Sequence, residues 1–188
     1  RPGWKQNLEK LEQASGRSIE SYADLLDVLK QRRQHFKAHG AKATDHGAAS
    51  ADIHPLSDWE VEKLFDQALQ GQLTREDAER LEGHALFDQA RLSAEEDGLV
   101  MQLHLGVTRN HNPELFEKYG PDMGSDIPHR VNWTTGLQPL MAAFGNNANF
   151  HAILFTLDES TYTRELAPLA ASRASKIITS SPLIPASR

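Results

Sequence analysis

The sequence predicts an α/β fold in which about three parallel strands alternate with intervening helices. Three short segments have strand composition, residues 41–44, 99–105 and 148–155, and helical patterns separate them. Strands that alternate with helices form parallel sheets, because each helix returns the chain to the same edge. Polar side chains end each segment, where barrel enzymes carry their reactive groups. We therefore predict an incomplete (β/α)8 TIM barrel, since three strands cannot close a barrel.

Two helices are predicted before the first strand. Apolar residues at helical spacing predict a helix over residues 4–14, and Gly16 ends it. A second helix begins near Ser21, a residue that caps helix N-termini, and carries a buried stripe of leucine and valine. Gly40 follows this helix at a position that suits the left-handed conformation.

Capping signals predict two more helices between the first and second strands. Ser57, with Glu60 three residues later, forms a capping box that opens a helix ending at Gly71. Thr74 repeats the signal and begins a long helix that reaches Leu92. The second strand then follows directly.

The second half of the chain predicts three further helices. Asn112 caps a short helix, and residues 121–130 form a loop rich in Gly, Asp and Pro. Helical periodicity covers residues 131–144 and 160–171. Residues 172–188 show no periodicity, so we predict a barrel portion over residues 1–171 and an irregular tail over 172–188.

Composition limits the classes of function. The 188 residues carry a net charge of -6, and this acidic balance argues against a nucleic-acid partner. No apolar run approaches the length of a membrane span, so no membrane partner is expected. The chain has no cysteine, so any metal ion must be held by His, Asp or Glu. We expect a cytoplasmic enzyme, and homo-oligomer formation is compatible with the sequence.

The second strand holds the first candidate site residue, His104. A strand buried on both faces is nearly all apolar, so Gln102 and His104 are anomalous. Gly106 and a polar loop follow, which places His104 at the solvent end of the strand. A neutral imidazole there could move a proton or bind a metal ion. The alternative is a hydrogen-bonded core histidine.

Further candidates follow each strand. Asp45 and His46 come after the first strand and could act in acid–base chemistry or bind substrate; alternatively, Asp45 caps a turn and His46 is solvated. Arg109 could bind a carboxylate through its guanidinium fork, or it is an ordinary surface residue. Asp158 either lines the pocket or, like Glu159, is an acid that favours the helix dipole.

Three motifs together resemble the uronate (glucuronate) isomerases, members of the amidohydrolase superfamily of (β/α)8 barrels. They are KATDHG over residues 42–47, MQLHLGVTRN over 101–110 and YGPDMGSD over 119–126. The resemblance extends over about residues 1–170. It implies that this chain is the central-to-late portion of such a barrel.

The resemblance implies an aldose–ketose isomerase. Such an enzyme interconverts D-glucuronate and D-fructuronate, and D-galacturonate and D-tagaturonate, by proton transfer between C2 and C1. Asp45 and His104 match the active-site Asp and His at the ends of the fifth and sixth strands. We expect these two residues to be catalytic and His46, Arg109 and Asp158 to bind the uronate sugar.

The chain also departs from the family pattern. The family's His-x-His on the first strand and Asp on the last strand, which hold a divalent metal ion, have no counterpart here. The Trp-Arg-Pro string that ends the fourth strand is also missing. We therefore expect no metal ligand in this chain, with the ion, zinc by expectation, bound by residues outside it. The chain alone is predicted to be inactive.

Two alternatives remain at this point. The first is a metal-dependent hydrolase of the same superfamily, which would need more His or Lys ligands than this chain offers. The second is a non-catalytic helical binding module in which the strands are incidental.

Overall fold

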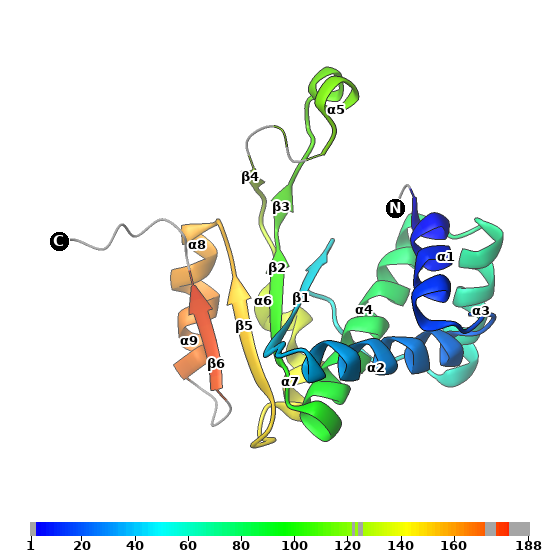
Figure 1. The fold of residues 1–188 in the computed structure, drawn as a ribbon. Coiled ribbons are helices and arrows are strands. Elements are labelled where there is room, and N and C mark those ends of the chain that lie inside the picture. Colours follow the sequence, from blue (N-terminus) through cyan, green and yellow to red (C-terminus); the bar gives the residue numbers. More distant parts are fainter. Residues whose placement is uncertain (1–2, 122, 124–125, 172–175, 181–188) are drawn as a thin grey trace.

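Four parallel strands form the main sheet of the computed structural model, which describes residues 3–121, 123, 126–171 and 176–180 (Figure 1). The strands are β1 (Ala43–Ala48), β2 (Val100–Leu105), β5 (His151–Phe155) and β6 (Lys176–Ser180), in the order β1-β2-β5-β6. All three neighbouring pairs are parallel, and helices occupy the connections. The predicted α/β class is confirmed.

The strand boundaries differ from the prediction in three places. The first strand covers Ala43–Ala48 rather than residues 41–44, because its pairing with β2 continues past Asp45. The third begins only at His151, since a turn precedes it. A fourth strand, β6, lies within residues 172–188, which were wrongly predicted to be irregular throughout. The rest of that tail, residues 172–175 and 181–188, lies outside the described residues.

The helices of the first half agree with the prediction. They are α1 (Trp4–Ser15), α2 (Tyr22–Ala38), α3 (Asp58–Gln70) and α4 (Arg75–Leu92), which continues into a π-helical turn, η1 (Ser93–Asp97). Ser21 caps α2, and Ser57 with Glu60 forms the predicted capping box of α3. Thr74 accepts the backbone N–H of Asp77 at the start of α4. Local capping chemistry therefore sets these boundaries.

The short helix predicted after Asn112 is found as α5, whereas the later helices are more divided than expected. They are α5 (Pro113–Tyr119), α6 (Trp133–Gly136), α7 (Gln138–Phe144), α8 (Glu159–Thr161), a π-helical turn η2 (Tyr162–Leu166) and α9 (Ala167–Ala171). The single helix predicted over residues 131–144 is divided near Pro139, which has no N–H to continue the hydrogen-bond ladder. The helix predicted over 160–171 widens into the π-helical turn between two short α segments.

The two faces of the sheet have different surroundings. Met101, Leu103 and Leu105 of β2 are at most 1% exposed and join a core with side chains of α4 and α7. The alternate residues of β2, Gln102 and His104, are half-buried on the opposite face. Side chains alternate between the faces of a strand, so the apolar residues of β2 direct His104 away from the helices.

The helices α1 to α4 form a second core beside the sheet (Figure 1). Phe65 of α3 is 1% exposed and meets Trp4 of α1 and Tyr22 of α2 edge-on, each with ring centroids 6.0 Å apart. Tyr22 also donates its hydroxyl to the buried carboxylate of Asp88 in α4 at 2.9 Å. These contacts hold the four helices as one layer.

A buried ion pair joins this helical layer to the sheet. Arg33 of α2 is 6% exposed, and its guanidinium donates to both carboxylate oxygens of Asp97 at 2.6 and 2.8 Å. It also donates to Gln89 and Ser93 of the α4–η1 segment. Asp97 in turn accepts the N–H of Leu99, immediately before β2, at 2.9 Å. The pair thus connects α2, α4 and the start of β2.

An arm, formed by residues 107–121 and 126–128, projects beyond the carboxyl end of β2 (Figure 1). Its described part contains β3 (Val107–Thr108) paired antiparallel with β4 (Ile127–Pro128), and α5 lies between them. The strand β4 corrects the prediction of a loop over residues 121–130. At the arm's base Gly106 has a φ of 78°, and a Cβ there would lie 2.7 Å from the side chain of Val131, so the position requires glycine.

Replacement of Arg33 by Met in the complete protein is expected to destabilise the fold strongly. The change leaves Asp97 charged, buried and unpaired, a defect that costs about 3–5 kcal/mol. Arg17→Met is the matched control, because Arg17 and Asp27 form an exposed pair 3.6 Å apart. Such a pair contributes about 1 kcal/mol or less. Thermal midpoints check this, and equal shifts in the two variants would contradict it.

The same pair is expected to make stability depend on acid. Burial raises the pKa of the Asp97 carboxyl, but the hydrogen bond from Arg33 and the Leu99 N–H outweigh it, so the net pKa lies below its ordinary 3.8. A carboxyl with a depressed folded-state pKa stabilises the fold above its unfolded pKa and loses that contribution as pH falls through the folded value. Asp97→Asn cannot titrate. The difference in thermal midpoint between wild type and Asp97→Asn should therefore narrow below pH 3.8; a constant difference would refute the assignment.

Candidate functional site

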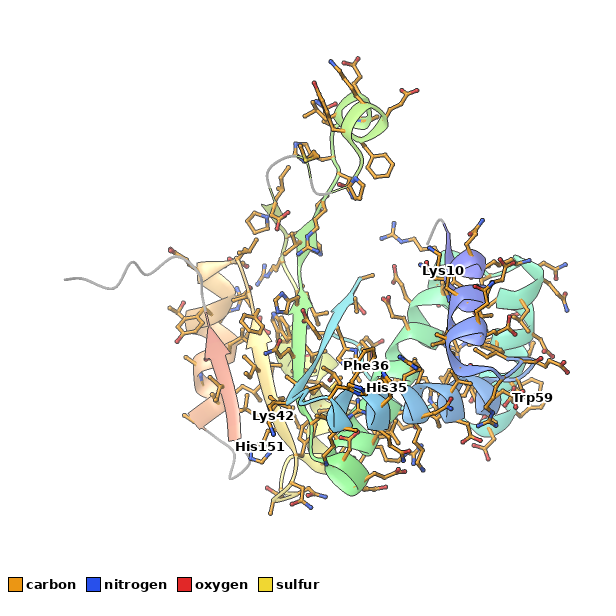
Figure 2. All side chains as sticks on the ribbon, viewed as in Figure 1. Lys10, His35, Phe36, Lys42, Trp59 and His151 are labelled. Atoms are coloured by element: carbon orange, nitrogen blue, oxygen red, sulfur yellow. The ribbon has the colours of Figure 1, made fainter. Side chains whose placement is uncertain are left out.

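The candidate site lies on the face of the sheet that points away from α4 and α7, near the carboxyl ends of the strands. Strand register places Gly47 of β1 opposite His104 of β2, and His104 opposite Phe155 of β5. Asp45 is two residues before Gly47 and therefore shares this face. Lys42 directly precedes β1, and His151 is the first residue of β5. Both lie at the opposite end of the sheet (Figure 2). We call this surface the Asp45–His104 face.

Asp45 and His104 are brought together as predicted. Oδ1 of Asp45 lies 3.3 Å from Nε2 of His104, with the two side chains 64% and 36% exposed. Their orientation does not make a hydrogen bond, and Nε2 is a buried atom that has no hydrogen-bond partner among the described residues. A buried polar nitrogen without a partner is unfavourable unless a ligand completes it. The pair can therefore offer one carboxylate and one imidazole nitrogen to a bound molecule.

Phe155 is a site neighbour that sequence reasoning missed. The rings of His104 and Phe155 pack with centroids 4.1 Å apart at an angle of 41°. This contact supports one side of the imidazole, while Gly47 on the other side has no side chain. Phe155 ends a predicted strand, so its sequence position was a signal, but only the register between strands pairs it with His104.

His46 lies on the other face of β1. Its Nε2 is 2.9 Å from Oγ1 of Thr44, two residues away on the same side of the strand. Burial, followed by the charge of Arg33, lowers the pKa of His46 to about 4 despite the opposing charge of Asp45. A histidine with that pKa is neutral near pH 7. The structure therefore does not bring His46 to Asp45 and His104.

Arg109 directly follows β3 in the arm, and the β3 segment projects away from the main sheet (Figure 1). Its Nε is 3.5 Å from Oδ1 of Asp126, and both side chains are about half exposed. The described structure does not place Arg109 beside the Asp45–His104 pair. Asn112 caps α5 as predicted, since its side chain accepts the backbone N–H groups of Glu114 and Leu115. Asp122, Gly124 and Ser125 of the third motif lie outside the described residues.

Asp158 acts as the N-cap of α8. Its carboxylate accepts the backbone N–H of Ser160 at 3.0 Å and the hydroxyls of Ser160 and Thr161 at 2.7 and 2.5 Å. The hydroxyl of Thr161, followed by that of Ser160, lowers the pKa of Asp158 to about 2. Both oxygens are thus engaged within one helical turn. Glu159 begins α8, at the N-terminal position predicted for it.

The described residues do not assemble a metal site by themselves. Across residues 3–121, 123, 126–171 and 176–180, no group of three or more His, Asp or Glu side chains could hold an ion. Asp45 and His104 supply two donors at most. No helix in the same residues is long and apolar enough to cross a membrane.

A cavity of about 870 Å³ lies elsewhere, between α1, α3 and α4. Its lining is largely apolar and includes Trp4, Phe65 and Leu81. The catalytic candidates do not line it. Because the candidate residues lie on the Asp45–His104 face, we base the functional argument on that face rather than on this cavity.

Comparison with known proteins identifies a family. The family model described as glucuronate isomerase matches residues 1–182. A uronate isomerase from Nostoc punctiforme is 53% identical over 90% of this chain and 36% of its own length, and one from Brucella canis is 44% identical over the same shares. The chain thus spans about a third of the length of the curated relatives it matches.

Solved structures agree. The crystal structure of a glucuronate isomerase from Caulobacter crescentus matches with a TM-score of 0.90 and 40% identity, covering 95% of this chain and 37% of that one. A uronate isomerase from Thermotoga maritima matches with a TM-score of 0.88 at 22% identity, over 98% of this chain and 40% of that one, and this likeness concerns the fold.

Substitution of Asp158 tests its capping role. Asp158→Ala in the complete protein should lose about 1 kcal/mol of stability, because the N-cap interaction is lost. Asp158→Asn retains a side-chain oxygen that caps helices equally well and should stay within a few tenths of a kcal/mol of wild type. Thermal midpoints measure both. Equal midpoints for Asp158→Ala and wild type would contradict the capping role.

Proposed function

We infer that the complete protein interconverts D-glucuronate and D-fructuronate, and D-galacturonate and D-tagaturonate, because this chain belongs to the glucuronate isomerase family. In this reaction the open-chain aldose loses its C2 proton and gains a proton at C1. The C1 carbonyl oxygen becomes a hydroxyl, while the C2 hydroxyl gives up its proton and becomes the new carbonyl. The balance needs no oxidant or reductant.

The observation that carries this proposal is the 3.3 Å approach of Asp45 to His104 on adjacent strands. Abstraction of a proton next to a carbonyl needs a positioned base, and the enediolate that forms needs a hydrogen-bond donor or positive charge. Asp45 would carry the proton or accept hydrogen bonds from the sugar hydroxyls. His104 would polarise the carbonyl or hold a hydroxyl through its unpartnered Nε2.

Of the expected substrate-binding residues, Arg109 keeps that role in our proposal. Its guanidinium could pair with the sugar carboxylate, since its contact with Asp126 is exposed and therefore weak. The surroundings of His46 and Asp158 favour structural roles instead. His46 would hold β1 against the helical side, and Asp158 would begin α8.

A divalent metal ion, zinc by expectation, is part of the proposal for the complete protein. A bound ion would polarise a substrate oxygen as a Lewis acid. The described residues do not form a site for it. We propose that its ligands lie outside this chain, and we assign no step of the reaction to it here.

His104→Asn in the complete protein tests the proposal. We expect turnover of D-glucuronate to fall by about 10²-fold or more with an unchanged melting midpoint, since loss of an acid–base or oxyanion-stabilising group has that effect. His39→Asn, at the exposed end of α2, is the matched control and should leave turnover unchanged.

Other outcomes favour other functions. Unchanged turnover in His104→Asn would contradict the catalytic assignment. Hydrolysis of lactones or amides by the wild type, without isomerisation of uronates, would indicate a metal-dependent hydrolase of the superfamily. The family match favours the isomerase over this hydrolase and over a non-catalytic helical binding module.

A further inference from the structure

Gly47 is a glycine that its surroundings in the described structure do not require. It lies inside β1 with no positive φ, so any residue could adopt its backbone conformation. Among the described residues other than its chain neighbours, a Cβ built on Gly47 would have one atom within 4 Å. That atom is the carbonyl oxygen of His104, at 3.7 Å. That is an ordinary van der Waals contact. Glycine weakens a strand, and it often marks a position where a ligand approaches closely.

The space that Gly47 leaves lies beside the imidazole of His104. Gly47 and His104 are register partners in adjacent parallel strands, so a side chain on Gly47 would stand about 4.8 Å from that of His104 on the same face. The other flank of the imidazole is filled by Phe155, with ring centroids 4.1 Å apart. The imidazole is therefore packed against an aromatic ring on the β5 side, and on the β1 side its neighbour has no side chain.

Asp45 borders the same space. It precedes Gly47 by two residues on the same strand face, and its Oδ1 is 3.3 Å from Nε2 of His104. Gly47 itself is exposed. A molecule that lies over Gly47 can thus contact the carboxylate and the imidazole together.

We propose that Gly47 is a substrate-binding position, whose missing side chain admits the C1 carbonyl and C2 hydroxyl of an open-chain uronate beside His104 and Asp45. This inference rests on the proposed function. Proton transfer requires the reacting atoms to lie about 3–3.5 Å apart, and a misplacement of about 1 Å can lower the rate by about 10²-fold. A branched side chain on Gly47 would occupy the space and hold the sugar away from both groups.

A graded series in the complete protein tests this inference, with Gly47→Ala and Gly47→Val assayed on D-glucuronate. We expect kcat/KM to fall by about tenfold or more in Gly47→Val and by less in Gly47→Ala. Melting midpoints should stay equal or rise, because Ala and Val suit a strand at least as well as Gly. Loss of activity with gain of stability is a combination that a purely structural glycine would not show.

Ala43→Val is the matched control. Ala43 lies on the same face of β1 as Gly47 but pairs with Val100, four residues before His104. Added bulk there should leave kcat/KM within about twofold of wild type. A similar loss in Ala43→Val and Gly47→Val would show that the strand tolerates no bulk anywhere and would overturn the inference.

The remaining outcomes are also decisive. Wild-type kcat/KM in Gly47→Val overturns the inference, and so does a loss that merely follows a lowered melting midpoint. If His104→Asn is inactive while Gly47→Val is normal, only this inference fails and the proposed function stands. If wild type isomerises no uronate, the proposed function fails and this inference fails with it.

Discussion

The buried ion pair between Arg33 and Asp97 is the interaction on which the geometry of the site depends. It brings α2 to the junction where α4 ends and β2 begins, and Asp97 also accepts the N–H of Leu99. The residue that pairs with Arg33 therefore also sets the start of β2. Because β2 pairs in parallel with β1 and β5, Gly47 and Phe155 stand opposite His104. The ion pair thus connects the helical layer to the strand that carries His104.

Apolar burial holds this register in place. Met101, Leu103 and Leu105 are at most 1% exposed on the helix side of β2. A slip by one residue would turn these side chains to the other face and send His104 into the core. Burial of each such side chain stabilises the fold by about 1.5–3 kcal/mol, which exceeds the stabilisation from an exposed polar contact. The direction of the His104 imidazole is thus a consequence of the packing behind the sheet.

Features set by local chemistry could be predicted from the sequence, and features set by pairing could not. Capping at Ser57 and the polar interruption of β2 at His104 depend on neighbouring residues alone, and both predictions are confirmed. The strand β6 was missed because its five residues are too few to show a periodic sequence pattern, and only pairing with β5 defines it as a strand. The contact of Phe155 with His104 depends on register between strands, which one sequence does not reveal. The position of His46 follows instead from alternation along β1, once the strand is known to extend past Asp45. The role of Arg109 stays a prediction.

Two ionisable residues that are adjacent on β1 have different surroundings. Asp45 and His46 are adjacent in sequence, yet alternation of the strand places them on opposite faces. Burial and the charge of Arg33 lower the pKa of His46 to about 4, so its ring stays neutral and cannot donate a second proton near pH 7. Asp45 instead lies in the open beside His104. The two faces of β1 thus present a buried neutral imidazole on one side and an exposed carboxylate on the other.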